Sequence, residues 1–192
     1  GATYSSVASF GLGTIMGQLT ESIADASEHY TDTTNVVKVQ LYLPDDIDSL
    51  TDLEFLTKGG AFALESADGS WEIMQYRDAV QTSDYAYTLS HLLRGRLNST
   101  TNAHAGGARV VFLEYTKAVP ADTSMIGVSL THRAASNGRA PELAYPQPGT
   151  YTAKSQTEWP VANLLLSRAS STITATAVPR HRFGTELVPV RS

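Results

Sequence analysis

The sequence has 192 residues, a mass of 20.6 kDa, a formal net charge of −5 and no cysteine. This length allows one medium domain or two small ones, with about 70% of the unfolded surface buried on folding. Hydrophobic residues make up 42% and charged residues 17%, which excludes a disordered chain. The negative charge argues against a nucleic-acid partner, because phosphate binding requires clustered Lys and Arg. The lack of cysteine excludes disulfides, thiolate zinc sites and cysteine nucleophiles.

No apolar run approaches the roughly 20 residues that a membrane helix needs, so we expect no membrane insertion. The sequence starts at Gly1-Ala2-Thr3-Tyr4, without an initiator Met or the basic-then-apolar pattern of a signal peptide. We expect this start to be a processed end or a fragment boundary.

Residues 12–23 carry two conflicting signals. Apolar side chains recur at helical spacing, which favours an amphipathic helix. However, Gly11, Gly13 and Gly17 each lower helix propensity by up to about 1 kcal/mol. We therefore expect extended or irregular structure in this segment.

The next elements are predicted as strands, with one short helical turn. Residues 37–43 alternate apolar and polar side chains, which is typical of a half-buried strand. Residues 48–56 could form a helical turn with Asp46 or Asp48 as its N-cap. Residues 61–76 predict a hairpin, because two strand-like runs flank the turn sequence Ala-Asp-Gly-Ser.

Short strands continue to the end of the chain and predict the fold class. They are expected at residues 85–89, 109–113, 125–131, 163–167 and 172–178, the last two joined by a small polar turn. Strands at such spacing, without alternating helices, predict an all-β protein with a β-sandwich or barrel-like main domain.

A change of composition suggests the domain boundaries. Residues 134–156 are rich in Pro, Gly and small polar residues and show no period, which predicts a loop or linker. We therefore expect a main β domain over residues 1–133. A C-terminal β segment, either a hairpin or a partial fibronectin-like piece, is expected over residues 157–192.

Two motifs suggest ligands only weakly. The glycines between Gly11 and Gly17 have the wrong spacing for a dinucleotide fingerprint and lack its βαβ context, so flexible glycines at a strand end are favoured. Asp45, Asp46 and Asp48 could offer oxygens to Ca²⁺, but the spacing of a calcium loop is missing, and a solvated turn is favoured. We expect no cofactor and no metal.

The sequence also shows no catalytic motif, and we expect no catalytic residues. The five histidines lack the spacing of a zinc hydrolase, and no serine lies in a nucleophile elbow. A pair of carboxylates at glycosidase distance stays an open alternative that sequence alone does not test. Its candidates are Glu65, Glu72, Asp78 and Asp84.

Arg94, Gly95 and Arg96 form the most unusual local pattern, because two arginines flank a glycine where a strand should end. One interpretation is structural: Gly95 permits a bend, and the guanidinium groups bind nearby carbonyls or carboxylates. The other is contact with an anionic ligand. We favour the structural interpretation, because Arg commonly ties loops together.

The residues around these arginines resemble a known family. They are Trp71-Glu72-Ile73-Met74-Gln75-Tyr76, Tyr87-Thr88-Leu89-Ser90-His91-Leu92-Leu93-Arg94-Gly95-Arg96, Ala103-His104-Ala105-Gly106 and Arg109-Val110-Val111-Phe112-Leu113. In this order they resemble the C-terminal half of the tail-tip proteins of long-tailed bacteriophages and gene transfer agents, also called baseplate hub or host-specificity proteins. Weaker similarity extends to Trp159-Pro160-Val161-Ala162-Asn163-Leu164 and Val178-Pro179-Arg180-His181-Arg182-Phe183-Gly184. The sequence departs from the family after Arg96, where Leu97-Asn98-Ser99-Thr100 replaces the usual Gly-Thr and acidic residue, and at Ala177, where a Trp is usual.

The resemblance implies a non-enzymatic structural role in the virion. It implies assembly with other phage tail proteins, as a ring or homotrimer at the tail end, and presentation of receptor-binding parts. An alternative is a carbohydrate-binding module that recognises a host surface glycan. Its tyrosines could stack on sugars: Tyr30, Tyr42, Tyr76, Tyr85, Tyr87, Tyr115, Tyr145 and Tyr151. A third possibility is a cell-wall glycosidase.

Overall fold

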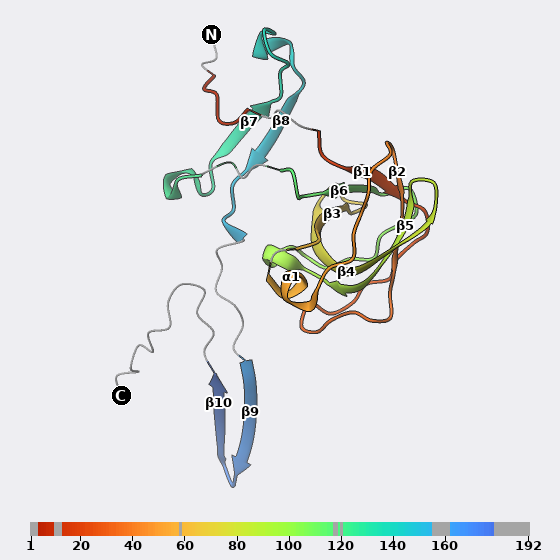
Figure 1. The fold of residues 1–192 in the computed structure, drawn as a ribbon. Coiled ribbons are helices and arrows are strands. Elements are labelled where there is room, and N and C mark those ends of the chain that lie inside the picture. The colour runs from red at the N-terminus through yellow and green to blue at the C-terminus, as the bar shows by residue number, and fades with distance from the viewer. Residues whose placement is uncertain are drawn as a thin grey trace. The chain divides into compact units, whose positions relative to one another are not determined.

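The structure is a computed structural model, and it describes residues 4–9, 13–57, 59–116, 119, 121–154 and 162–178. The chain divides into two compact units, Gly1–Thr152 and Ala153–Ser192. The first unit contains a closed β-barrel and a separate hairpin, and the second contains another hairpin (Figure 1). In the described part of the chain, no helix is long and apolar enough to cross a membrane.

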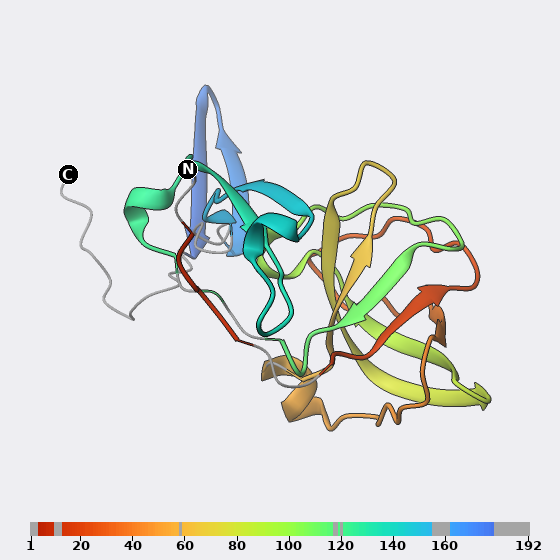
Figure 2. The same cartoon turned by 90° about the horizontal axis from the view of Figure 1, so that it is seen from above.

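Six strands form the barrel, and every neighbouring pair is antiparallel. They are β1 (Met16–Leu19), β2 (Val37–Leu41), β3 (Ala61–Glu65), β4 (Trp71–Ser83), β5 (Ala86–Leu93) and β6 (Arg109–Phe112). The spatial order is β1-β2-β5-β4-β3-β6, and β6 pairs with β1 to close the ring (Figure 2). The predicted all-β class is confirmed, and the main domain is a barrel.

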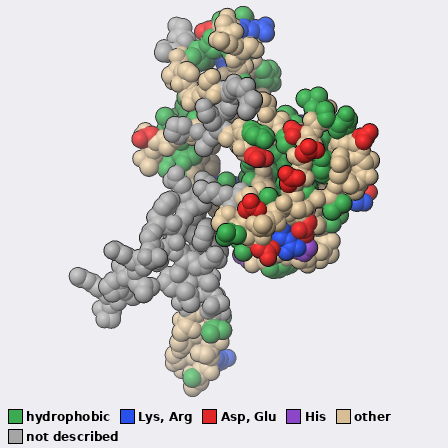
Figure 3. Space-filling view, viewed as in Figure 1, with side chains coloured by type: hydrophobic (Ala, Val, Ile, Leu, Met, Phe, Trp, Pro, Cys, Tyr) green, Lys and Arg blue, Asp and Glu red, His purple; other side chains and the backbone are tan. Residues whose placement is uncertain are grey.

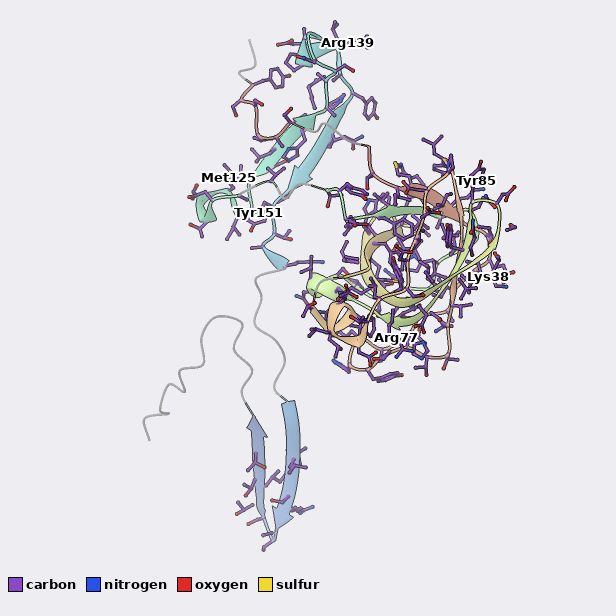
Figure 4. All side chains as sticks on the ribbon, in the orientation of Figure 1. Lys38, Arg77, Tyr85, Met125, Arg139 and Tyr151 are labelled. Atoms are coloured by element: carbon purple, nitrogen blue, oxygen red, sulfur yellow. The ribbon has the colours of Figure 1, made fainter. Side chains whose placement is uncertain are left out.

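The barrel interior holds the hydrophobic core (Figure 4). In β2 the buried residues Val37, Val39 and Leu41 alternate with half-buried polar ones, as the period of two predicts. Three rings, Phe62, Tyr76 and Phe112, meet at centroid distances of 5.9–6.3 Å. Such aromatic contacts add to the stabilisation from area burial alone.

The ambiguous N-terminal segment is extended, as expected from its glycines. It forms β1, which lies between β2 and β6 and buries Leu19. Gly17 is required there by space, because a Cβ would lie 2.4 Å from the carbonyl oxygen of Gln40 on β2. The glycine therefore permits close approach of two strands.

The predicted helical turn exists, but its cap was predicted wrongly. The helix α1 spans Asp52–Thr57, and its cap is Thr51, whose hydroxyl accepts a hydrogen bond from the Glu54 amide at 3.3 Å. The Glu54 carboxylate accepts one in return from the Thr51 amide at 2.9 Å. This reciprocal capping box satisfies two helix-terminal donors, and Asp46 and Asp48 lie too far before Asp52 to be the N-cap.

The separate hairpin of the first unit overlaps the segment that the sequence predicted as a loop or linker. Strand β7 (Ser129–Arg133) pairs with β8 (Pro146–Thr150), so part of residues 134–156 is a strand. Both strands are edges, where alternate amide positions need no partner, and Pro146 and Pro148 are therefore compatible with pairing. Short 3-10 turns, η2 (Thr123–Met125) and η3 (Pro141–Leu143), lie before and between these strands.

The second unit contains the predicted C-terminal hairpin. Strand β9 (Ala162–Ala169) pairs with β10 (Thr172–Val178), and Ser170 in the connecting turn has φ +54.

Candidate functional site

Four charged or titratable residues lie buried together at one end of the barrel: Asp32, Glu72, Arg94 and His104, here called the buried ionic cluster. None is more than 3% exposed. Two β-bridges hold the long β1–β2 connection against this end, pairing Ile23 with His104 and Asp32 with Leu92. The cluster therefore joins three segments that are distant in sequence.

Arg94 is the centre of the cluster. Its Nε and Nη2 donate to the two carboxylate oxygens of Glu72 at 2.7 and 2.9 Å, a bidentate pair. Its remaining donors reach the backbone carbonyls of Ala24 at 3.0 Å and Asn102 at 2.7 Å. Asp32 lies 3.6 Å away. This is the arrangement that the structural interpretation of the arginine motif describes.

Glu72 accepts hydrogen bonds from every side. Besides Arg94, the amides of Gly95 and Asn102 donate to its carboxylate at 3.1 and 3.2 Å. Burial acts to raise the pKa of Glu72, but the hydrogen bonds from His104 and Arg94 outweigh it and hold the pKa below its ordinary value. The buried carboxylate is thus fully compensated.

His104 bridges the cluster to the end of strand β3. One ring nitrogen, Nε2, lies 2.8 Å from the Glu72 carboxylate, and the other, Nδ1, lies 2.9 Å from the carbonyl oxygen of Glu65. His104 therefore links the Glu72 carboxylate to the backbone of β3. The sequence reasoning missed this contact, because His104 and Glu72 are 32 residues apart.

Asp32 is held by its own turn. It accepts from the amides of Thr34 and Asn35, each at 3.0 Å, and from the Asn35 side chain at 2.8 Å. Burial raises its pKa, but these hydrogen bonds, led by that of the Asn35 amide, lower it overall.

Gly95 and Arg96 extend this hydrogen-bonded connection from Arg94 towards strand β4 and the α1 region. Gly95 has φ +60, and a Cβ there would lie 3.0 Å from Glu28 and Thr101. It precedes the 3-10 turn η1 (Arg96–Asn98). Arg96 Nε donates to Gln75 at 2.7 Å, and burial lowers the pKa of Arg96. Gln75 in turn donates to backbone carbonyls of the α1 region.

The other candidate carboxylates are engaged elsewhere. Glu65 forms a bidentate pair with Arg109 at 2.8 and 2.6 Å, and Asp78 pairs with Arg77 at 3.0 Å. Arg77 lies on the outside of the barrel (Figure 4). Asp84 is exposed in the β4–β5 turn. Three of the four carboxylates therefore serve ion pairs within the fold.

A pocket of about 880 Å³ lies beside α1, lined partly by the acidic turn that the sequence offered as a calcium site. Among the described residues, no group of three or more His, Asp or Glu side chains could hold a metal ion. We call this the acidic pocket, because its described lining includes four carboxylates: Asp46, Asp48, Glu54 and Glu114.

Tyr76 also lines the acidic pocket, and only 6% of its surface is exposed to solvent. Burial raises the pKa of Tyr76 to about 12, with smaller contributions from the charges of Glu114 and Asp48.

The tyrosines proposed as sugar platforms divide into three groups, and Tyr151 is the half-buried one. Tyr76 and Tyr87 are core residues, at 6% and 4% exposure. Exposed ones are Tyr30, Tyr42, Tyr85, Tyr115 and Tyr145. Of the weaker family motifs, residues 155–161 and 179–184 lie outside the described residues, as do Gly11 and Leu12.

Comparison with protein families gives a match over most of the barrel. The family model described as Rcc01698-like, C-terminal, matches residues 14–111, just over half of the chain. The match begins before β1 and ends within β6. A search of curated proteins finds no match.

Proposed function

We propose that this chain, which belongs to the Rcc01698-like, C-terminal family, is a non-enzymatic structural component of a bacteriophage tail tip. The proposal rests on the resemblance of residues 71–113 to tail-tip proteins, and the barrel strands β4, β5 and β6 lie within that segment. We propose further that the protein resides in the virion and assembles with other tail proteins as a ring or homotrimer.

The observation that best supports this proposal is the structural role of Arg94, which belongs to the family motif in residues 71–113, here called the signature. Arg94, which ends the characteristic strand, is 1% exposed and has donors satisfied by Glu72 and two backbone carbonyls. A ligand-binding arginine would need donors free to reach the ligand. The signature therefore serves the architecture of the barrel, which is what a structural component requires.

The hairpins supply surfaces for assembly. β9 and β10 expose Leu165, Leu166 and Ile173 at 67–68%, and the β7–β8 connection exposes Leu143 and Tyr145 at 69% and 79%. A two-stranded hairpin is marginally stable alone in water. Burial of these side chains against another tail protein would stabilise both hairpins.

Electron microscopy of purified particles tests the location. Antibodies raised against the barrel should label the tail tip of particles released by the organism that encodes this chain. Antibody preadsorbed with the protein is the control. Labelling of the host envelope, or no label on intact and opened particles that retain their tails, would contradict the proposal.

A carbohydrate-binding module is a second candidate, favoured by the exposed tyrosines. Tyr30, Tyr42 and Tyr145 are 64%, 52% and 79% exposed and offer aromatic faces to sugars. Binding of the isolated chain to a glycan array, abolished by replacing one of these tyrosines with Ala, would support this function.

A further inference from the structure

Helix α1 presents two leucines to solvent. Leu53 and Leu56 are 74% and 65% exposed, and side chains three positions apart lie on the same face of a helix. Phe55, between them, is 4% exposed and packs inward. The helix lies on the outside of the barrel, on the side turned to the viewer of Figure 1. It therefore carries a small apolar surface that is open to a partner.

The N-terminal end of α1 is negatively charged. The preceding residues Asp45, Asp46 and Asp48, here called the acidic turn, are exposed, and within the described part of the chain none of them forms an ion pair. The turn leads into Ser49, whose hydroxyl accepts a hydrogen bond from the Ala79 amide of β4 at 2.9 Å. Figure 3 shows several acidic side chains over this side of the barrel. This end of α1 therefore adjoins carboxylates that have no counter-ion among the described residues.

Arg96 lies at the opposite end of α1. Its Nε donates to Gln75 Oε1 of β4 at 2.7 Å. Gln75 Nε2 donates to the carbonyl oxygens of Phe55 and Gly59, at the C-terminal end of the helix, at 3.1 and 2.9 Å. Gln75 is 4% exposed, so it holds the guanidinium group in a fixed position. Since Gln75 precedes Ala79 on β4 by about 13 Å along the strand, the helix with its two leucines lies between the acidic turn and Arg96.

Arg96 differs from the other described arginines of the barrel, because it has no carboxylate partner. Arg77, Arg94 and Arg109 each form an ion pair. Arg96 donates through Nε alone, which leaves Nη1 and Nη2 without a partner among the described residues. These two groups form the fork that binds a carboxylate with two parallel hydrogen bonds. Burial lowers the pKa of Arg96 and no neighbouring charge opposes that effect, so a carboxylate from outside would supply the missing compensation.

An apolar centre with opposite charges at its two ends is complementary to itself. When two α1 helices pack antiparallel about a two-fold axis, the leucines meet and each acidic turn faces the Arg96 of the other copy. A ring of three copies around the leucines makes the same contact from each copy to the next. An apolar centre with a charged rim that contains Arg is also the usual composition of a protein interface. An unrelated partner would need the same features in reverse order, whereas a second copy supplies them by symmetry.

We propose that this surface, composed of Leu53, Leu56, the acidic turn and Arg96, binds the same surface of a second copy of the chain. Arg96 of one copy pairs with the acidic turn of the next. The inference deepens the proposed assembly as a ring or homotrimer but does not rest on the location in the virion. A trimer formed through this surface would support both proposals. A dimer would support the contact and assign any ring to other surfaces, and a monomer would refute the contact while labelling of the tail tip stays a separate test.

Sedimentation equilibrium of the full chain tests the contact at about 0.01–1 mM, because a surface of this size binds weakly. We expect the parent chain to associate. Replacing both leucines, Leu53→Ser and Leu56→Ser, should weaken association by roughly tenfold or more through lost apolar burial. Both side chains are exposed, so the melting temperature should stay unchanged. A parent chain that stays monomeric at the highest concentration, or a leucine variant that associates equally well, would refute the proposal.

Charge reversal separates the contact from a structural role of Arg96. Arg96→Glu should weaken association by roughly tenfold, and so should Asp46→Lys with Asp48→Lys, since attractions become repulsions. All three changes in one chain exchange the two signs and should restore association, which damage to the fold would not do. Arg139→Glu, in the exposed β7–β8 connection, makes the same change in charge as Arg96→Glu and should leave association unchanged. A three-fold variant with the circular dichroism of the parent but without restored association would overturn the contact.

An introduced thiol locates the contact, because the sequence has no cysteine of its own. Leu56→Cys should form a disulfide between copies under mild oxidation, since the leucines of neighbouring copies meet within the short reach of such a bond. Asp84→Cys places a thiol on the exposed β4–β5 turn and should stay largely reduced under the same conditions. Equal crosslinking of the two variants would indicate random collision and would overturn the assignment of this surface.

Discussion

At the scale of single residues, Arg94 shows how hydrogen bonds compensate a buried charge. A buried ion pair costs desolvation, and only good geometry and additional hydrogen bonds offset that cost. Arg94 has both, with a bidentate carboxylate and two carbonyl acceptors. Removing the guanidinium leaves Glu72 as an uncompensated buried anion.

We therefore expect Arg94→Ala to lower the free energy of unfolding by about 3–5 kcal/mol. Arg109→Ala is the matched control, because Arg109 makes a similar bidentate pair with Glu65 while 55% exposed at its side chain. Its loss should cost below about 1 kcal/mol, since solvent screens exposed pairs. Urea unfolding measures both. Equal effects would show that burial does not determine the contribution of the pair.

Gly95 contributes through its backbone and its lack of a side chain. We expect Gly95→Ala to destabilise the fold by about 1–2 kcal/mol from the positive φ, plus a steric cost against Glu28 and Thr101. Gly69→Ala separates the two effects, because Gly69 has φ +80 and nothing within 4 Å of a Cβ. Thermal melting of the two variants should place the Gly95 variant lower. The steric account fails if the two melt alike.

At the scale of elements, β1 depends on Gly17 because of its contact with β2. A Cβ at Gly17 would lie 2.4 Å from Gln40 O and 2.9 Å from Val39, so the strands must separate. We expect Gly17→Ala to lower stability by about 1–3 kcal/mol and to speed amide exchange at the β1–β2 seam. The same change at Gly13, which has nothing within 4 Å, should be nearly neutral. Rapid exchange in both variants would point to fraying of the whole segment instead.

The elements also show what the sequence could predict. Alternation identified β2, and the Asp-Gly-Ser turn identified the β3–β4 hairpin, because both signals are local. The strand β8 was missed, since its two prolines resemble a loop and only pairing with β7 makes them compatible with a strand. The arginine motif was predictable as a tie, but its partners Glu72, Ala24 and Asn102 were not, because the barrel brings them together from distant positions.

At the scale of the whole molecule, we expect the buried carboxylates to make the stability of the protein sensitive to acid. The pKa values of Glu72 and Asp32 are both lowered in the folded state. Their stabilisation is therefore fully present above the unfolded values of about 4.3 and 3.9, and is lost as pH falls through the folded values.

We expect the melting temperature to change little between about pH 7 and pH 5 from these groups and to fall steeply below about pH 4. Glu72→Gln should melt lower at pH 7 and show a shallower decline in acid, because one of the two buried carboxylates with a lowered pKa is gone. Calorimetry across this range measures both. A parallel decline of variant and parent would assign the acid sensitivity to other carboxylates.

Closure of the barrel limits which strands can pair with a strand from another chain. In the ring β1-β2-β5-β4-β3-β6, each strand is hydrogen-bonded to a neighbour on both sides, so no strand of the barrel is left to template a seventh. The two described hairpins, β7–β8 and β9–β10, have only two strands each. Each of these strands therefore has one edge that is not paired with another strand of its sheet. Among the described strands, the edges of these hairpins are therefore the ones open to strand addition from a partner chain, whereas the barrel strands have no free edge.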